Sequence, residues 1–383
     1  MPMFCANEGI RWDDASGLPA EFEMAHAQAY VWHPYGYSEM TGLANASFAE
    51  KEVALYPTPH TMLVKMHLEG ALEFLDAPGE WALGEDDYVY LWPSTPAVSP
   101  NDISVSAALA PRLFDIAGAS TQQSTDIVKD ITIANMTLLG SGWLRNFECE
   151  WADRMNSQPA RDPTGQWAFT REGMIRMENA SNITVTGCEL LAAGTSAVWM
   201  EHYAQNCTID TNWIEHASFT GIHINGYDID NGKIPGEHNF TTAAEADVSF
   251  GHRISNNLIT NMGLHVTYGG GVYVHQAHDI LVEYNEISWS QRNLISTFGY
   301  PPAVHTKMYD VEVDFFTQYD LTTSSYLTFR GNDLSHACGD SQDCGIWEAW
   351  CPGRSNTVVG NSFHDNWATM GQAFTMLFPD SAK

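Results

Sequence analysis

A short phrase recurs through the C-terminal part of the chain: an Asn at a turn, followed by an apolar, β-prone run. Successive copies lie 24, 45, 28, 47 and 29 residues apart. The short intervals suit one coil of a parallel solenoid, and the long ones suit a coil that carries an inserted loop. The copies are centred on Cys188, which takes the Asn place, and on Asn212, Asn257, Asn285, Asn332 and Asn361.

Each Asn stands between two β-prone runs, such as Ile280–Val282 before Asn285 and Asn293–Ser296 after it. Strand, Asn turn, strand and turn predict an all-β fold, a right-handed parallel β-helix in which the Asn amides stack at one bend and satisfy backbone groups. A leucine-rich repeat would show fixed Leu spacing, and a propeller would show a period of about 40 residues. We therefore expect these Asn side chains to hold turns and to do no chemistry.

The remaining segments divide the chain into domains. Polar and aromatic insertions lie near 146–171, 228–249 and 301–324, where solenoid loops wall a groove. The N-terminal part lacks the Asn phrase and contains two strands around an acidic turn at Gly84–Asp87. The predicted domains are a possible partial first coil at 1–20, an inserted β-rich subdomain at 21–115, and the β-helix at 116–383.

The composition excludes several kinds of partner. The chain has 17 Lys and Arg against 47 Asp and Glu, a net charge of −30. This charge argues against nucleic acid and anionic membranes as partners, because both need a basic surface. No apolar stretch approaches 18 residues, so we expect no membrane insertion. The charged fraction of 17% is low because coil turns use Asn, Gly and Thr where helices would use Lys and Glu.

The seven cysteines are an odd number in a large chain and do not form a disulfide framework. Cys338, Cys344 and Cys351 lie close together in sequence and could include one bridge, or all three could be free thiols. No CxxC pair occurs, so the sequence predicts neither zinc nor another metal. The chain start shows no basic segment followed by an apolar one, so no signal peptide is visible.

Two segments resemble a known group of proteins. Leu75–Trp81, which reads LDAPGEW, is followed by Tyr90–Pro93, and Gly339–Trp347 combines an acidic turn, an Asp-x-Gly step and an apolar-aromatic run. These motifs resemble carbohydrate-active right-handed β-helix proteins with a pectate-lyase-like solenoid, including glycoside hydrolase family 141. The resemblance covers about residue 60 to the end. It implies a β subdomain inserted near the start of the helix, and secreted hydrolysis of a polysaccharide or glycan by two carboxylic acids.

Stacking the second strand of each coil in register gives one inward and two outward columns of side chains. Val198, Ile222, Val272, Leu294, Ile346 and Phe374 would point inward. The outward columns would be Trp199, His223, Tyr273, Ile295, Trp347 and Thr375, and then Glu201, Asn225, His275, Thr297 and Ala349. Aromatic faces stack on sugars while His bonds hydroxyls, so we predict substrate binding by Trp199, His223, Tyr273, His275 and Trp347. The alternative is that these aromatics pack beneath the insertions or the N-terminal subdomain.

Hydrolysis of a glycosidic bond needs an acid and a second carboxylate. Asp343, which the resemblance places on an active groove, is the first candidate, and Asp340 on the same turn or Glu201 on the predicted strip is its partner. Either Asp could instead cap its own turn. Glu348 falls in an inward register, so it is a bend residue or a sign that the register slips by one there.

The sequence thus favours an extracellular or periplasmic glycoside hydrolase that needs no cofactor and acts on a polysaccharide or glycan. The acidic charge fits a neutral glycan better than a polyuronate. A polysaccharide lyase of the same fold is an alternative, with Arg292 or Lys307 as the base. A non-catalytic carbohydrate-binding or cell-surface protein is another, since solenoids make good scaffolds.

Overall fold

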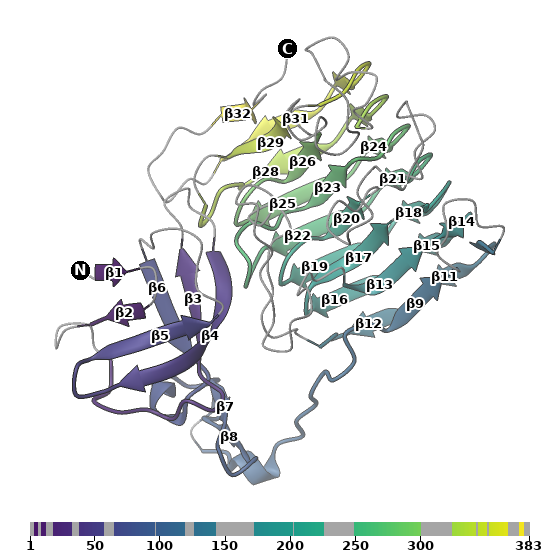
Figure 1. Cartoon of the computed structure of the whole chain (residues 1–383). Helices are drawn as coiled ribbons and strands as arrows, with labels where there is room; N and C mark the ends of the chain where they lie inside the picture. The colour runs from purple at the N-terminus through teal and green to yellow at the C-terminus, as the bar shows by residue number, and fades with distance from the viewer. Residues whose placement is uncertain are drawn as a thin grey trace. The chain divides into compact units, whose positions relative to one another are not determined.

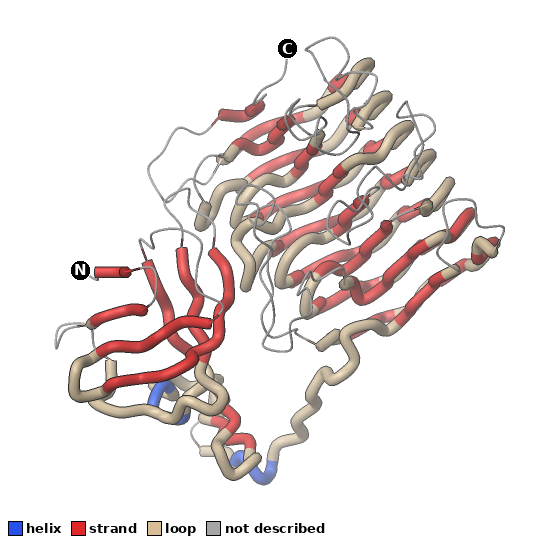
Figure 2. Tube along the Cα trace, viewed as in Figure 1, coloured by secondary structure: helices blue, strands red, loops and turns tan. Residues whose placement is uncertain are grey.

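A computed structural model gives the fold (Figures 1 and 2). It describes residues 4–6, 9–12, 18–32, 38–56, 65–95, 97–118, 126–142, 172–201, 203–225, 249–299, 324–341, 344–350, 352–366 and 375–378. The three predicted insertions lie almost entirely outside these residues. The chain divides into two compact units, one that includes Met1–Ala107 and one formed by Ala108–Trp143 and Arg171–Lys383.

The second unit is a stack of coils in which each coil adds one strand to each of three parallel sheets. The first sheet contains β9 (Phe114–Ala117), β13 (Gly173–Glu178), β17 (Ser196–Glu201), β20 (Ile222–Asn225), β23 (Val272–His275), β26 (Ile295–Phe298), β29 (Gly345–Trp350) and β32 (Thr375–Phe378), in that order. The second contains β11 (Thr132–Ala134), β15 (Thr184–Thr186), β18 (Thr208–Asp210), β21 (Arg253–Ser255), β24 (Leu281–Glu283), β27 (Thr328–Arg330) and β30 (Thr357–Val359). The third contains β12 (Thr137–Leu139), β16 (Glu189–Ala193), β19 (Trp213–Ala217), β22 (Leu258–Met262), β25 (Glu286–Ser290), β28 (Asp333–Ser335) and β31 (Ser362–His364). A short parallel pair, β10 (Val128–Lys129) and β14 (Ala180–Ser181), completes the unit. The three stacked parallel sheets confirm the predicted parallel β-helix.

The predicted Asn ladder is present between the second and third sheets. The Oδ1 atom of Asn285 accepts from the backbone N–H of Asn257 at 3.0 Å and from its Nδ2 at 2.9 Å, and the same pair of bonds repeats from rung to rung. Each Nδ2 also donates to a carbonyl, as Asn285 does to Ile254. The rungs are Asn212, Asn257, Asn285, Asn332 and Asn361, and Cys188 donates its N–H to the first.

The residue before each rung has a positive φ, which turns the chain sharply into the next sheet. At this place the chain uses Gly187, Thr211, Asn256, Tyr284, Gly331 and Gly360. The left-handed residue makes the bend and the following amide satisfies the backbone groups that the bend exposes. The recurring Asn phrase in the sequence therefore corresponds to a corner that repeats from coil to coil.

His252 plays the same part at another corner. Its Nδ1 accepts from the N–H of Cys207 at 3.1 Å, and Asn356 accepts from Leu327 at 2.9 Å at the equivalent place of a later coil. Burial, together with the nearby His278, lowers the pKa of His252 from 6.5 to about 3. The folded protein therefore holds this ring neutral at pH values where the unfolded chain would protonate it.

A pH-dependent loss of stability follows. The unfolded chain binds the proton more tightly, so the free energy of unfolding falls as the pH drops from 6.5 toward 3 and this contribution is complete above 6.5. His252→Asn keeps an acceptor but does not titrate. Urea unfolding would measure the free energy of unfolding of both proteins at pH 8 and at pH 4.5. We expect that of the wild type to fall by about 2–3 kcal/mol more than that of the variant between these two pH values. Parallel pH profiles for the two proteins would contradict this.

The first unit is built around a six-stranded antiparallel sheet in the order β1 (Phe4–Ala6), β2 (Gly9–Arg11), β5 (Glu52–Tyr56), β4 (Ser38–Ser47), β3 (Gln28–Trp32) and β6 (Lys65–Glu69). Its core includes Trp12, Phe22, Val31 and Leu55. Residues 1–20 were expected as a partial coil, but β1 and β2 belong to this sheet instead. A short 3-10 helix, η2 (Leu72–Phe74), and the hairpin of β7 (Trp81–Leu83) and β8 (Val89–Leu91) follow, with a second such helix, η3 (Pro100–Asp102). Among the described residues, no helix has the length and apolarity needed to span a membrane.

Candidate functional site

The outer face of the first sheet presents two columns of side chains. Strand register places Asp115, Arg176, Trp199, His223, Tyr273, Ser296 and Glu348 in the first column. The second column holds Glu178, Glu201, Asn225, His275, Phe298 and Trp350. The residues just before the first column, Val198, Ile222 and Val272, point into the core as predicted. Polar, charged and aromatic groups from seven consecutive strands thus share one surface.

The predicted register is wrong by one residue at β26 and β29. Ile295 and Trp347 align with Val272 and face inward; Trp347 packs on the core, with its ring 5.3 Å from that of Phe329. Leu294 and Ile346 are buried in the core as expected, but they occupy the preceding place in the coil, which Gly221 and Gly271 hold in earlier coils. Thr297 and Ala349 likewise align with the core residue Val274, while Phe374 and the Thr375 side chain lie outside the described residues.

The correction moves Glu348 onto the outer face, where sequence reasoning missed it. It also replaces Thr297 and Ala349 in the second outward column by Phe298 and Trp350. The signal that could have found this shift is the apolar pair Leu294-Ile295 and Ile346-Trp347, where the two preceding coils have Gly221 and Gly271 before one apolar residue. Trp347 is consequently no part of a sugar-binding strip.

A continuous row of rings crosses the outer face. The ring centroids of Trp199 and His223 are 4.1 Å apart, those of His223 and His275 are 4.7 Å apart, and Tyr273 lies 5.5 Å from His275. Phe298 extends the row at 4.9 Å from His275, and Trp350 at 4.4 Å from Phe298. We call these six residues the ring row. It brings together Trp199, His223, Tyr273 and His275, as the sequence predicted.

The ring row is largely buried rather than exposed. Trp199, His223, Tyr273 and Phe298 are buried and only Trp350 is half-buried. The turns before β20 and β23 supply part of the cover: the Phe219 ring lies 5.7 Å from His223, and the Tyr273 hydroxyl donates to the carbonyl of Tyr268 at 2.7 Å. The face is therefore accessible from its ends rather than along its length.

Glu201 lies at the end of the face nearest the first coil. Its Oε1 atom accepts from Nε of Arg176 at 2.9 Å, and Nη2 of Arg176 contacts both Glu201 and Glu178. Arg176 also reaches Asp115 at 3.2 Å. Burial alone would raise the pKa of the Asp115 carboxyl, but hydrogen bonds and charge from Arg112 and Arg176 outweigh it and lower that pKa. The carboxylates of Asp115, Glu178 and Glu201 all form ion pairs with the guanidinium of Arg176.

Glu348 lies at the other end, beside Arg292 and Asn293. Its Oε2 atom accepts from Nδ2 of Asn293 and lies 3.5 Å from Nη2 of Arg292. The guanidinium also donates from Nη1 to the Ser341 hydroxyl at 2.9 Å and packs 4.3 Å over the Tyr268 ring. One arginine head thus connects the Glu348 carboxylate to the loop that contains Ser341. An arginine held in this way is unsuited to act as the base of a lyase, and Lys307 lies outside the described residues.

The loop that carries the predicted acids is closed by a disulfide between Cys338 and Cys344. Its backbone is pinned to the preceding coil, since Cys338 donates to the carbonyl of Arg292 at 2.9 Å and Asp340 to that of Gln291 at 3.2 Å. Asp340 is half-buried beside Ser341, while Asp343 and Cys351 lie outside the described residues. Cys188 and Cys207 are free and buried.

The two ends of the face are too far apart to work as one catalytic pair. Strands β17 and β29 are separated by β20, β23 and β26, so Glu201 and Glu348 stand roughly 19 Å apart along the sheet. Paired carboxylates of glycosidases lie at most about 10 Å apart. The structure therefore does not bring Glu201 together with the Cys338–Cys344 loop. Within the described residues, no three His, Cys, Asp or Glu side chains gather as metal ligands.

Comparisons with known proteins identify the fold. The family model of the right handed beta helix region matches residues 173–366. A solved structure named as a glycoside hydrolase is similar, with a TM-score of 0.58 at 14% identity over 93% of this chain and 68% of that chain. Weaker similarity is found to an alginate lyase from Paenibacillus sp. str. FPU-7, with a TM-score of 0.31 at 14% identity over 54% of this chain and 68% of that chain. DFA-IIIase from Arthrobacter chlorophenolicus A6 has a TM-score of 0.26 at 13% identity over 67% of this chain and 65% of that chain.

No curated protein matches the chain in sequence. At 14% identity, the likeness to the glycoside hydrolase structure reports a shared fold. The family model spans just over half of the chain and covers the coils from β13 to β31. The repeating corners, the three parallel sheets and this match together show that the chain belongs to the right-handed β-helix family.

Proposed function

We propose that the chain is a glycoside hydrolase that cleaves a polysaccharide or complex glycan at the Glu348 end of the outer face. The observation that supports this best is the link through Arg292, which joins the Glu348 carboxylate to the loop of Asp340 and Asp343. Hydrolysis requires two carboxyl groups on either side of the glycosidic bond. The similar solved structure is named as a glycoside hydrolase, which supports the proposal by analogy of fold alone.

The two carboxyl groups would have different roles. Glu348 sits beside a guanidinium and an amide donor, which stabilise a negative charge, so it is suited to act as nucleophile or as base toward water. Asp343 would then protonate the leaving oxygen, with Asp340 as the alternative acid on the same loop. Glu201, engaged by Arg176 at the far end, would bind substrate or hold the sheet rather than take part in bond cleavage.

The substrate would approach from the accessible end of the face. Trp350 is half-buried in the outward column and offers an apolar ring surface to a sugar, the role that the sequence assigned to Trp347. Tyr273, His275 and the rest of the ring row would form the floor behind it. The net charge of −30 favours a neutral glycan over a polyuronate.

Asp343→Asn tests the acid. Removing a general acid is expected to lower kcat by about 10³-fold on the substrate that a panel of neutral polysaccharides identifies. Asp340→Asn is the matched variant on the same loop, and we expect it to stay within about tenfold of the wild type. Product analysis separates the mechanisms, since a hydrolase releases a saturated reducing sugar and a lyase an unsaturated one. Unchanged rates in both Asp variants would remove this loop from the mechanism, and binding without cleavage by the wild type would favour the scaffold alternative.

We also propose an extracellular or periplasmic location. The Cys338–Cys344 disulfide supports it, because structural disulfides persist in oxidising compartments and are rare in the cytosol. Mass spectrometry of the protein purified from its source, after alkylation of free thiols, would find these two cysteines unmodified. Complete alkylation of both would argue for a reducing compartment.

A further inference from the structure

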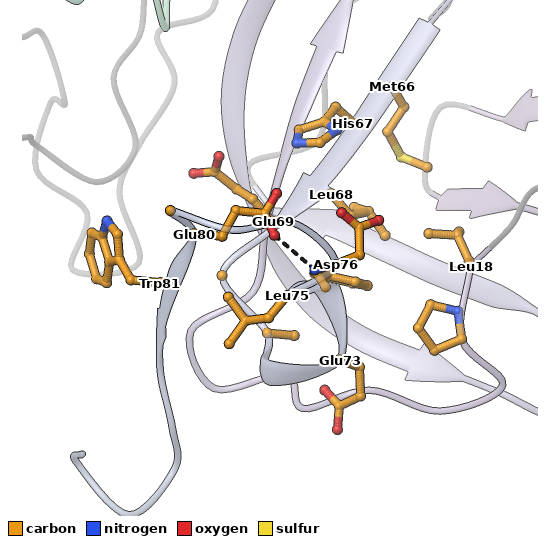
Figure 3. A pocket seen from close by; sticks show the side chains of 15 residues that line it. Leu18, Met66, His67, Leu68, Glu69, Glu73, Leu75, Asp76, Glu80 and Trp81 are labelled. Carbon is orange, nitrogen blue, oxygen red and sulfur yellow. Dashed lines mark hydrogen bonds between the residues drawn. The ribbon is translucent and has the colours of Figure 1, made fainter. Parts of the chain in front are cut away.

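The first unit contains a cavity of its own. It has a volume of about 710 Å³, in the range of ligand-binding pockets, and lies between the end of β6, η2 and the start of β7 (Figure 3). Its apolar lining includes Leu68, Phe74 and Leu75, and its polar lining includes Glu69 and Asp76. The segment Leu75–Trp81, one of the motifs singled out in the sequence, forms one side of it.

Most carboxylates of this cavity are held by the protein. The Oε2 atom of Glu80 accepts from the backbone N–H groups of Asp76 and Ala77 at 2.8 and 2.9 Å and so fixes the loop. Glu69 accepts from the Gln28 amide at 2.6 Å. The carboxylate of Asp76 differs, because it is exposed and makes no hydrogen bond or ion pair among the described residues. It is therefore available to a ligand hydroxyl.

Trp81 stands at the edge of the cavity with 65% of its surface exposed. No ring–ring contact or hydrogen bond of its side chain occurs within the described part of the chain, so most of the ring surface is open to a ligand. The same hairpin exposes Tyr88, Tyr90 and Trp92. A cluster of exposed aromatic residues on a soluble protein marks an interaction site, and a ring with a polar edge suits the apolar face of a sugar.

The charges of the side chains that line the cavity restrict the class of ligand that it can bind. Four carboxylates line the cavity, from Glu69, Glu73, Asp76 and Glu80, and none of the lining residues is Lys or Arg. An anionic glycan would be repelled, whereas a hydroxyl-rich neutral one can donate hydrogen bonds to Asp76 while a sugar ring stacks on Trp81. No set of three potential metal ligands occurs among the described residues, so the carboxylates do not form a cation site there.

We propose that this cavity is a second glycan-binding site, which takes a neutral glycan through Asp76 and Trp81 and does not cleave it. The choice of a glycan rests on the function proposed above, whereas the site itself is separate from the outer face of the β-helix. Its effect would be to hold a polymeric substrate, so it would matter for retention on a polysaccharide and not for the cleavage of a short oligosaccharide.

Affinity electrophoresis of the full chain through gels that contain neutral polysaccharides tests the proposal. Each variant carries Glu348→Gln as well, so that the gel is not digested. Trp81→Ala and Asp76→Asn should each weaken retention about tenfold in Kd on a gel that retards the parent protein. The matched control is Trp213→Ala, which removes another exposed Trp, 41% exposed on β19, and should leave retention unchanged. Thermal melting confirms that each variant is folded.

The outcomes separate this site from the proposed reaction. Weakened retention in both variants supports the site, even if no hydrolysis is found. If the protein does hydrolyse a glycan, the Trp81→Ala variant without Glu348→Gln should cleave a short substrate at the wild-type rate. Unchanged retention in folded Trp81→Ala and Asp76→Asn overturns the proposal, even if hydrolysis is found. If none of the neutral polysaccharide gels retains the parent protein, the proposal is overturned. It is also overturned if the only gel that retains the parent protein contains a cationic amino-sugar polymer.

Discussion

Glu348→Gln is expected to lower kcat by about 10³-fold while KM changes little. Glutamine has nearly the same shape and keeps an oxygen that can accept from Asn293, but it loses the charge beside Arg292. An amide can neither attack a sugar carbon nor take a proton from water, so the loss falls on the chemical step. Steady-state kinetics on the substrate found by the polysaccharide panel would measure it.

A matched control is Glu283→Gln on the second sheet. The side chain of Glu283 is 3% exposed, close to the 6% of Glu348, and it accepts from Arg253 at 2.9 Å and from Arg330 at 2.6 Å. Burial alone would raise its pKa, but hydrogen bonds from Arg330 and Arg253 outweigh this and lower the pKa. This variant also loses a buried charge beside arginine, yet it lies on a different sheet. We expect it to be less stable with an unchanged kcat. Equal losses of kcat in the two variants would mean that Glu348 acts through stability alone.

Asn285→Ala is expected to lower the free energy of unfolding by about 3–5 kcal/mol. The side chain lies in the middle of the Asn ladder, and its removal strands the N–H and one Nδ2 hydrogen of Asn257 and takes a donor from the carbonyl of Ile254. Oδ1 of Asn332 loses one of its two donors and keeps the backbone N–H of residue 285. All of these groups are buried, so water does not replace the lost bonds without opening the corner. Denaturant unfolding, with hydrogen exchange of the Asn257 amide as a local probe, would measure the effect.

Asn361→Ala provides the comparison at the last rung that the structure describes. Asn361 accepts from Asn332 and donates to Phe329, but no further rung follows it among the described residues, and it is only half-buried. Its loss should therefore cost about 1–2 kcal/mol. If the two variants cost the same, the stability of the corner does not depend on continuity of the ladder.

The corners could be predicted from sequence because one residue type does one local task in every coil. Asn257 and Asn285 each satisfy backbone groups of the preceding corner, so the sequence repeats wherever the geometry repeats. The outward register was predicted for β17, β20 and β23, and before β20 and β23 Gly221 and Gly271 precede a single inward apolar residue. It failed at β26 and β29 because two consecutive apolar residues both pack inward there, and alternation alone does not say which of the two takes the strand position.

Contacts between distant segments could not be predicted. Trp199 and Tyr273 are residue types that suit an exposed sugar platform, but both are buried, and burial depends on packing that no local pattern reports. The link from Glu348 to Ser341 runs through Arg292, which is 56 residues away from Glu348 in the chain. Only the coil geometry places these groups together. The disulfide likewise closes one of several open pairings.

The outer face of the first sheet is modular in one dimension. Its coils are joined by backbone hydrogen bonds and by the Asn ladder, and neither depends on which side chain points outward. Each coil therefore contributes an independent row of two outward residues, such as Tyr273 with His275, at intervals of roughly 4.8 Å. A ligand at one end of the face would therefore contact only the rows of the coils at that end. Specificity in such a protein can change by the replacement of a single coil, and the rows on either side keep their positions.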